Sequence, residues 1–334
     1  MRKSRNAKVH PPIIENGKFL NIEETPQLAK EASYGKVLKK NFKKPKDAFP
    51  SKELPYVTTN LKNLTAPKPV FVWFGHSSYL LSCKGFNLLV DPVFSGSASP
   101  FSFMIKAYEG ADYYKAEDMP NIDVLLQTHN HYDHLDKDTI ISLSGQTMDF
   151  VVSKNVGADL KKWDVPAKSI TELEWGEEVV ISNDLKITAT PARHFSGRGL
   201  KRDTSLWSSF VVEFFGMKIF VGGDSGYGNH FKEIGEAFGP FDIALLECGQ
   251  YDDFWPYIHM KPEETLQAAE DIKAAKLIPV HWGKFTLANH PWNESISRIT
   301  SAAENSNIQL ITPKIGEIVD LSGAKVFENW WENY

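Results

Sequence analysis

Short apolar runs, separated by turns rich in glycine, asparagine, aspartate and proline, recur along the chain from residue 70 onward. Runs of this length and composition are typical of buried β-strands. They predict strands at Val70–Phe74, Tyr79–Cys83, Leu88–Val90, Ile122–Leu126, Phe150–Ser153, Val179–Ile181, Leu185–Thr190, Leu206–Phe215, Lys218–Val221, Asp242–Leu246 and Lys276–Val280. Turns at Asn183-Asp184 and Gly216-Met217 predict that two pairs of these strands form hairpins.

Segments between the strands predict helices at Asp138–Leu143, Asn155–Trp163 and Pro262–Ala275. The third begins with proline and has glutamates in its first turn, and both features favour a helix start. A further helix is expected from Pro26 to Gly35, with Thr25 as its N-cap. Strands that alternate with helices and hairpins predict an α/β protein with α+β character.

The length of 334 residues and the hydrophobic content of 42% suffice for one large core. We expect residues 1–64 to be an N-terminal extension and residues 65–334 to form a single domain. Cys83 and Cys248 adjoin apolar runs, so we expect buried thiols in a reducing compartment. Because no apolar run reaches the length of a membrane span and the N-terminus resembles no signal peptide, we expect a cytoplasmic protein.

The formal net charge of −5 is unevenly distributed. Residues 1–46 carry 12 lysines and arginines against 4 glutamates, and six of these lysines lie between Lys36 and Lys46. One interpretation is peripheral contact with anionic lipid at the inner face of a membrane, since a lysine near such a surface contributes about 1 kcal/mol. The other is a solvated arm on an acidic body. We expect no nucleic-acid partner.

Histidine and aspartate side chains gather directly after the apolar run Ile122–Leu126. In an extended segment alternate side chains point to the same side, so His129 and His131 can face one metal ion. If the chain then turns toward a helix, Asp133 and His134 can reach a second ion. Imidazole nitrogen with carboxylate oxygen suits zinc, with manganese or iron as alternatives.

Three more candidate ligands, His194, Asp224 and His281, each follow another predicted strand. Active sites of α/β proteins assemble beyond the carboxyl ends of their strands. We therefore expect these three side chains to meet the histidine cluster at one edge of the sheets.

The pattern His129-x-His131-x-Asp133-His134 resembles the metallo-β-lactamase superfamily. Five other stretches resemble the N-acylphosphatidylethanolamine-hydrolysing phospholipase D family, in matching order: Trp73–Ser78, Leu89–Ser95, Pro191–Phe195, Gly222–Tyr227 and Val280–Phe285. The resemblance implies an αββα sandwich, in which two mixed β-sheets lie face to face between helices. It also implies a centre with two zinc ions, and it suggests a homodimer.

This resemblance leads to a complete ligand assignment. We expect one ion at His129, His131 and His194, a second at Asp133, His134 and His281, and Asp224 as a carboxylate that bridges both. Because they hold the ions at the reaction centre, Asp133 and Asp224 are catalytic candidates as well.

Other residues are expected beside the metals. The resemblance implies that Asp91 supports a metal-binding histidine and that His259 contacts phosphate or donates a proton to the leaving group. Ile258 stands where the mammalian family members have glutamine, which leaves the substrate contacts open. We expect His76 to be a structural hydrogen-bonding residue beside the site. His10 and His230 are expected at the surface, and the role of His290 stays open.

The expected activity is hydrolysis of a phosphodiester by a metal-bridging hydroxide, since metal binding lowers the pKa of water toward ~7. A small molecule or a phospholipid, such as N-acylphosphatidylethanolamine, is the expected substrate. One alternative is a metal-dependent lactonase or another soluble ester hydrolase, and another is a non-catalytic metal-binding module. Di-iron oxygen chemistry is disfavoured, because such relatives carry a carboxylate where Asn130 stands.

The long segment Phe94–Tyr114 is rich in glycine, serine and aromatic residues. Connections of this length are usually functional or mobile. It either lines an apolar substrate groove or is a loop that its aromatic side chains fix to the core.

Overall fold

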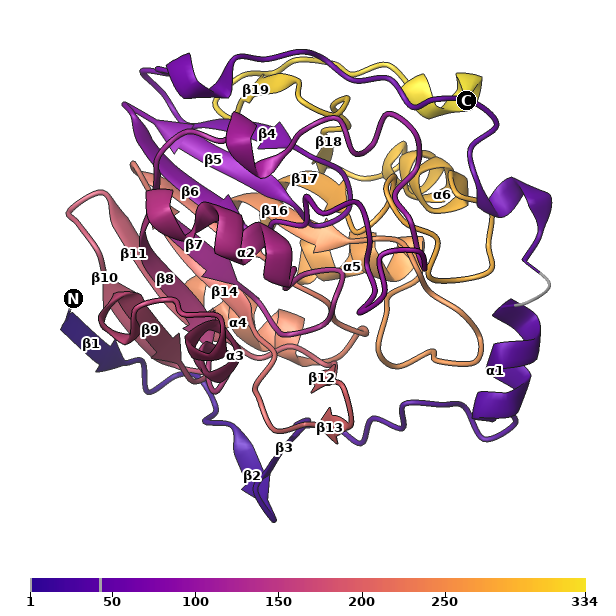
Figure 1. The fold of residues 1–334 in the computed structure, drawn as a ribbon, viewed down its shortest axis with the longest axis horizontal. Helices are drawn as coiled ribbons and strands as arrows, with labels where there is room; N and C mark the ends of the chain where they lie inside the picture. Colours follow the sequence, from indigo (N-terminus) through magenta and orange to yellow (C-terminus); the bar gives the residue numbers. More distant parts are fainter. Residues whose placement is uncertain (1, 42–43) are drawn as a thin grey trace.

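The computed structural model describes residues 2–41 and 44–334. Two large β-sheets lie against each other, with helices on their outer sides (Figure 1). One sheet has seven strands in the order β19-β4-β5-β6-β7-β8-β9, and the other has eight in the order β1-β10-β11-β14-β15-β16-β17-β18. This architecture confirms the αββα sandwich that the resemblance implied.

The seven-stranded sheet contains β4 (Val70–Trp73), β5 (Tyr79–Cys83), β6 (Phe86–Val90), β7 (Ile122–Gln127), β8 (Thr147–Ser153), β9 (Ile170–Leu173) and β19 (Ile318–Asp320). The eight-stranded sheet contains β1 (Arg2–Arg5), β10 (Glu177–Val180), β11 (Leu185–Thr190), β14 (Ser209–Phe214), β15 (Met217–Val221), β16 (Phe241–Glu247), β17 (Ala274–Val280) and β18 (Gln309–Leu310). Two small hairpins are formed by β2 (Ile13–Glu15) with β3 (Lys18–Leu20) and by β12 (Gly197–Arg198) with β13 (Lys201–Arg202).

The α-helices are α1 (Tyr34–Asn41), α2 (Lys137–Leu143), α3 (Gly157–Lys162), α4 (His230–Phe238), α5 (Pro262–Asp271) and α6 (Glu294–Ala303). None of the helices in the described ranges is long and apolar enough to cross a membrane.

Both sheets are mixed. β5 pairs antiparallel with both β4 and β6, whereas β6 through β9 run parallel to one another. In the other sheet, β10, β11, β14 and β15 are antiparallel and β15 through β18 are parallel. Every residue of β4 and β5 is buried, as expected for strands that are covered on both faces. Leu89 and Val124 of one sheet and Val212 and Ile243 of the other belong to the same apolar core.

The helix expected at Pro26–Gly35 is wrong, because the helix in this part of the chain is α1 and begins only at Tyr34. Contacts with distant segments explain the difference. The Thr25 hydroxyl donates to the carbonyl of Glu23 and accepts a hydrogen bond from Arg193, so it caps no helix. The N–H of Ala29 donates to the carbonyl of Phe254, which holds this stretch in an irregular path.

The expectation that His230 lies at the surface is also wrong. It is the first residue of α4 and is 6% exposed. Its Nε2 lies 3.1 Å from the Ser225 hydroxyl, and burial lowers the pKa of the ring to about 3. The expectation that Cys83 and Cys248 are buried thiols is confirmed, since both are buried and free.

Candidate metal centre

The candidate site lies where the carboxyl ends of strands from both sheets meet. Asp91 follows β6, the His129–His134 segment follows β7, and Asp224 and His281 follow β15 and β17. The strands β6 and β7 are parallel, and so are β15, β16 and β17. The loops after these strands therefore emerge at the same edge of each sheet, which is the location predicted from the sequence.

The structure brings all seven expected metal-binding residues into two adjacent groups, in each of which the donor atoms lie within 4.8 Å of one another. One group contains His129, His131, His194 and Asp224, and the other contains His76, Asp133, His134 and His281. Asp224 also faces the second group, because Oδ1 lies 3.1 Å from Nε2 of His134 and Oδ2 lies 3.1 Å from Nε2 of His281. Its carboxylate thus lies between the two groups.

The first group has the spacing of a shared metal ligand set. Nδ1 of His131 lies 3.0 Å from Nε2 of His129 and 3.1 Å from Nε2 of His194. Nitrogens bound tetrahedrally at 2.0–2.1 Å from one zinc ion lie about 3.3 Å apart. Within the described residues, the buried atoms Nε2 of His134 and Oδ1 of Asp224 make no hydrogen bond, although they approach each other. Buried polar atoms without hydrogen bonds are costly, and a cation would satisfy them. The donor set therefore fits metal ions.

The pKa values in the two groups differ in direction. Burial lowers the pKa of His129 and His194 well below the ordinary value and that of His131 to about 4. These rings are neutral at pH 7, as metal ligation requires. Burial opposes protonation of His281 too, but the carboxylates of Asp224 and Asp133 outweigh it and raise its pKa to about 10. The carboxylates therefore stabilise positive charge in the second group.

Two residues expected beside the metals orient the donors. Asp91 lies with its Oδ2 2.8 Å from Nδ1 of His134, so that Nε2 of this ring points toward Asp224. The same Asp91 carboxylate accepts hydrogen bonds from Thr128, which fixes its own position. His76 is fully buried and its Nε2 lies 2.9 Å from Oδ2 of Asp133, so it is within the second donor group rather than merely near it.

Glu247 was missed by the sequence analysis. It is the last residue of β16 and is fully buried, and burial raises its pKa. Its Oε2 lies 2.6 Å from Nδ1 of His259 and 3.3 Å from Nδ1 of His281, while Oε1 accepts from the N–H groups of Ser225 and Met260. Its position at the end of an apolar strand was the available indication, because Asp91 and Asp224 also lie at or just beyond strand ends.

The remaining histidines are placed as follows. His259 lies beside the donor groups, with its ring 5.1 Å from the rings of both His194 and His281, and its side chain is 13% exposed. His290 lies apart from the donor groups, where its ring stacks on Tyr251 and its Nε2 accepts from the N–H of Gln250. His10 is exposed, as expected.

Comparisons with known proteins agree with this architecture. The family model of the beta-lactamase superfamily domain matches residues 86–282. An uncharacterised protein of Mycobacterium tuberculosis is 39% identical over 286 residues, which cover 84% of this chain and 77% of the relative. The N-acyl-phosphatidylethanolamine-hydrolyzing phospholipase D 1 of Caenorhabditis elegans is 29% identical over 269 residues, or 75% of each chain. The solved structure of Igni18, a metallo hydrolase from Ignicoccus hospitalis, superposes with a TM-score of 0.57 at 22% identity and covers 75% of this chain and 97% of Igni18.

The facing mixed sheets, the donor groups at their strand ends and these similarities define a metal-dependent hydrolase. The chain belongs to the metallo-β-lactamase superfamily.

Proposed function

We propose that this protein is a dinuclear zinc-dependent hydrolase that cleaves phosphodiesters, with N-acylphosphatidylethanolamine as the substrate class. The proposal rests chiefly on the two donor groups that share Asp224. Two ions with one carboxylate between them suit in-line displacement at phosphorus. The activity in the name of the Caenorhabditis elegans relative supports both the phosphodiester and its N-acyl lipid.

The proposed ligand assignment follows the two groups. His129, His131 and His194 would hold one ion, Asp133, His134 and His281 would hold the other, and the carboxylate of Asp224, which faces both groups, would serve both. Bound there, the two ions would supply Lewis acidity toward the phosphoryl oxygens and a water of lowered pKa. Asp91 and His76 orient the ligands through their contacts with His134 and Asp133.

His259 is proposed as the proton donor to the leaving group. In the overall reaction the water oxygen bonds to phosphorus, the bond from phosphorus to the alcohol oxygen breaks, and a proton reaches that oxygen. The Nδ1 of His259 is held by Glu247, which leaves Nε2 of this partly exposed ring to meet the substrate. A histidine in hydrogen-bond reach of the leaving oxygen is the usual acid for this step.

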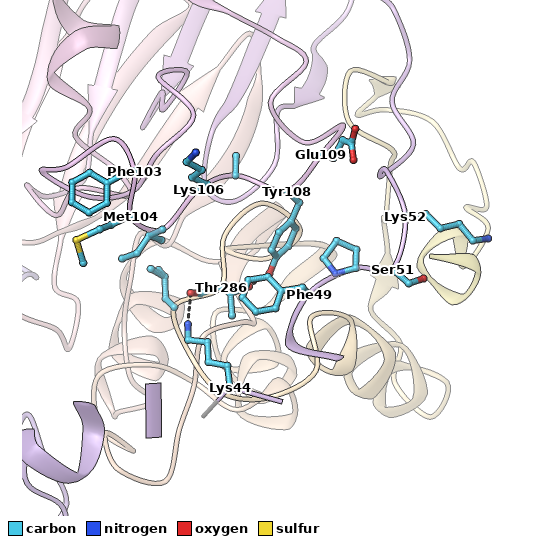
Figure 2. Close-up of a pocket in the computed structure, with 14 residues that line it drawn as sticks. Lys44, Phe49, Ser51, Lys52, Phe103, Met104, Lys106, Tyr108, Glu109 and Thr286 are labelled. Atoms are coloured by element: carbon cyan, nitrogen blue, oxygen red, sulfur yellow. Dashed lines mark hydrogen bonds between the residues drawn. The ribbon is translucent and has the colours of Figure 1, made fainter. Parts of the chain in front are cut away.

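A large apolar groove supports a lipid substrate. Its volume is about 770 Å³, and Phe49, Phe103 and Met104 line it together with Tyr108 (Figure 2). None of the metal-ligand candidates lines this groove, but the segment that follows His281 contributes Thr286 and Leu287. We propose that the groove receives an acyl chain while the phosphodiester lies at the metals.

The rim of the groove carries both exposed apolar and basic residues, and we propose that it is the face of peripheral contact with an anionic membrane. Phe101 is 57% exposed and Phe103 is 73% exposed, while Lys106 is exposed beside them. Two lysines of the basic stretch 36–46 are bound to other parts of the chain. Lys40 pairs with Asp252 at 2.6 Å, and Lys44 donates to the carbonyl of Thr286 at 2.6 Å (Figure 2). The charge of Lys40 is therefore offset by Asp252, so this lysine contributes less to docking than it would on a solvated arm.

A substrate panel tests this function. Purified protein loaded with zinc is assayed on N-acylphosphatidylethanolamine in vesicles, a soluble aryl phosphodiester, a lactone and a β-lactam, each with and without a chelator. We expect turnover of both phosphodiesters, faster for the lipid, and loss of turnover on chelation. Turnover of the lactone alone would replace the proposal with a lactonase. Full zinc occupancy without turnover of any substrate would favour the metal-binding module.

A further inference from the structure

The chain from Phe19 to Thr25, which we call the N-terminal clasp, lies against the loop that carries His194. Phe19 anchors it, since its ring is buried in a cluster with Trp175, Ala192 and Trp207. The N–H of Phe19 also donates to the carbonyl of Asp203 at 2.8 Å. The clasp lies outside residues 86–282, which the family model matches.

Asn21 of the clasp binds the backbone of His194 at two points. Its Nδ2 donates to the His194 carbonyl at 2.7 Å, and its Oδ1 accepts from the His194 N–H at 3.0 Å. Nε1 of Trp207 donates to the same Oδ1 at 3.2 Å, which holds the carboxamide in place. A carboxamide in this geometry acts like the peptide group of a neighbouring strand, because it satisfies one donor and one acceptor of a loop residue.

Arg193 fixes the same loop to the clasp at the preceding residue. Its Nε donates to the Thr25 hydroxyl at 3.0 Å and its Nη2 donates to the carbonyl of Glu24 at 2.8 Å. Its Nη1 donates to the carbonyl of Tyr227 at 2.8 Å, in the loop that follows Asp224. The clasp thus holds two successive residues of the His194 loop, and Arg193 links that loop to the one that follows Asp224.

The His194 ring depends on this backbone position. Its Nδ1 lies 2.8 Å from the carbonyl of Ile258, and its Nε2 lies 3.1 Å from Nδ1 of His131. A small shift of the loop would change the distance from Nε2 to its partners, whereas a metal site requires the ligand position to be held closely.

We propose that Asn21 is a positioning residue for metal binding at the group of His129, His131 and His194. The inference rests on the proposed function, because it takes these histidines as ligands. Asn21 fixes the backbone of the third ligand, so its loss weakens one of the two metal positions and leaves the other, which contains His134 and His281, nearly unchanged.

The test compares zinc binding by the wild type, Asn21→Ala, Asn21→Asp and the control Asn183→Ala, whose side chain is exposed in the turn between β10 and β11. Zinc stoichiometry and chelator competition are measured on each purified protein, with thermal unfolding of the zinc-free form as a check on folding. We expect Asn21→Ala to bind one equivalent about tenfold or more weakly, since partners that orient a ligand typically govern affinity by 10–100-fold. Asn21→Asp keeps the acceptor but sets an oxygen against the His194 carbonyl, so it should behave like Asn21→Ala.

Two equivalents in the wild type, with equal affinities in all four proteins, would overturn the role of Asn21 and leave the proposed function intact. Normal binding by Asn21→Asp together with weakened binding by Asn21→Ala would also overturn it, because packing rather than the paired hydrogen bonds would then matter. Fewer than two equivalents in the wild type would instead contradict the dinuclear centre itself.

Discussion

At the scale of single residues, Glu247 connects two functions of the site. One buried carboxylate oxygen lies against both His259, the proposed proton donor, and His281, a proposed metal ligand. Because the Nδ1 atoms of both rings face the same Glu247 oxygen, this carboxyl group fixes the orientation of both rings. Each Nε2 is thereby directed to the substrate or the metal.

We predict that Glu247→Gln, assayed at saturating zinc, lowers kcat by about tenfold or more, the usual effect of losing a partner that orients a functional histidine. The His259→Gln variant should retain both ions and also slow turnover. Since both act through the same proton, the double variant should be little slower than the slower single variant. Glu236→Gln, an exposed residue of α4, is the matched control. Multiplicative losses in the double variant would show that the two residues act independently.

The residues that were predicted from the sequence lie in local motifs, whereas those that were missed reach the site through contacts between distant segments. His129 through His134, His194, Asp224 and His281 stand in recognisable stretches that directly follow apolar strands. Asn21 and His194 are 173 positions apart, and no local pattern predicts that they meet. Glu247 ends a strand but belongs to none of the stretches that carried the family resemblance. Local pattern therefore predicts the donors and Asp91, whereas the contacts of Asn21 and Glu247 with the site become visible only in three dimensions.

At the scale of elements, most of the longer apolar strands were predicted, whereas polar strands and short ones such as β2 and β19 were missed. The boundaries of β5 and β11 agree with the expected strands. In contrast, β1 consists of Arg2, Lys3, Ser4 and Arg5, so apolar periodicity could not reveal it. It joins the sheet through β10, where Lys3 pairs with Glu177 at 3.4 Å and the Ser4 hydroxyl donates to Glu178 at 2.6 Å. Cross-strand pairs of this kind stabilise an edge without apolar burial.

The exposed side chains of Phe103 and Met104 beside the apolar groove lead to a prediction about membrane binding. We expect the wild type to sediment with anionic liposomes at low salt and to be released as salt rises, because headgroup contacts act within a Debye length. Burial of one phenylalanine or methionine side chain contributes about 1.5–3 kcal/mol, so Phe103→Ser combined with Met104→Ser should weaken sedimentation at least about tenfold.

Met148→Ser is the control for this experiment, because Met148 lies on β8 and is 68% exposed. Hydrolysis of a soluble phosphodiester should be unchanged in all these variants. Equal sedimentation by the wild type and the double variant would exclude this loop from docking and leave the metal centre unaffected.

At the scale of the whole molecule, the sandwich of two sheets brings loops from both sheets together at the candidate metal centre. The segment from His129 to His134 comes from the seven-stranded sheet, whereas His194, Asp224 and His281 come from the eight-stranded sheet. Neither sheet alone supplies a complete donor group. His131 is grouped with His194, and His134 is grouped with His281, and in each pair the second residue comes from the other sheet. Metal ions bound there would join the two sheets, so zinc should raise the stability of the folded protein as well as enable catalysis.

Asp224 is the residue through which the dinuclear account is tested most directly. We predict that elemental analysis of the purified wild type gives two zinc equivalents per chain. Asp224→Ala should give fewer than one and no measurable turnover of phosphodiester, because the bridging carboxylate contacts both donor groups. The exposed Asp47→Ala variant should match the wild type. Two equivalents and normal turnover in Asp224→Ala would contradict the bridge, and with it the dinuclear centre proposed for this protein.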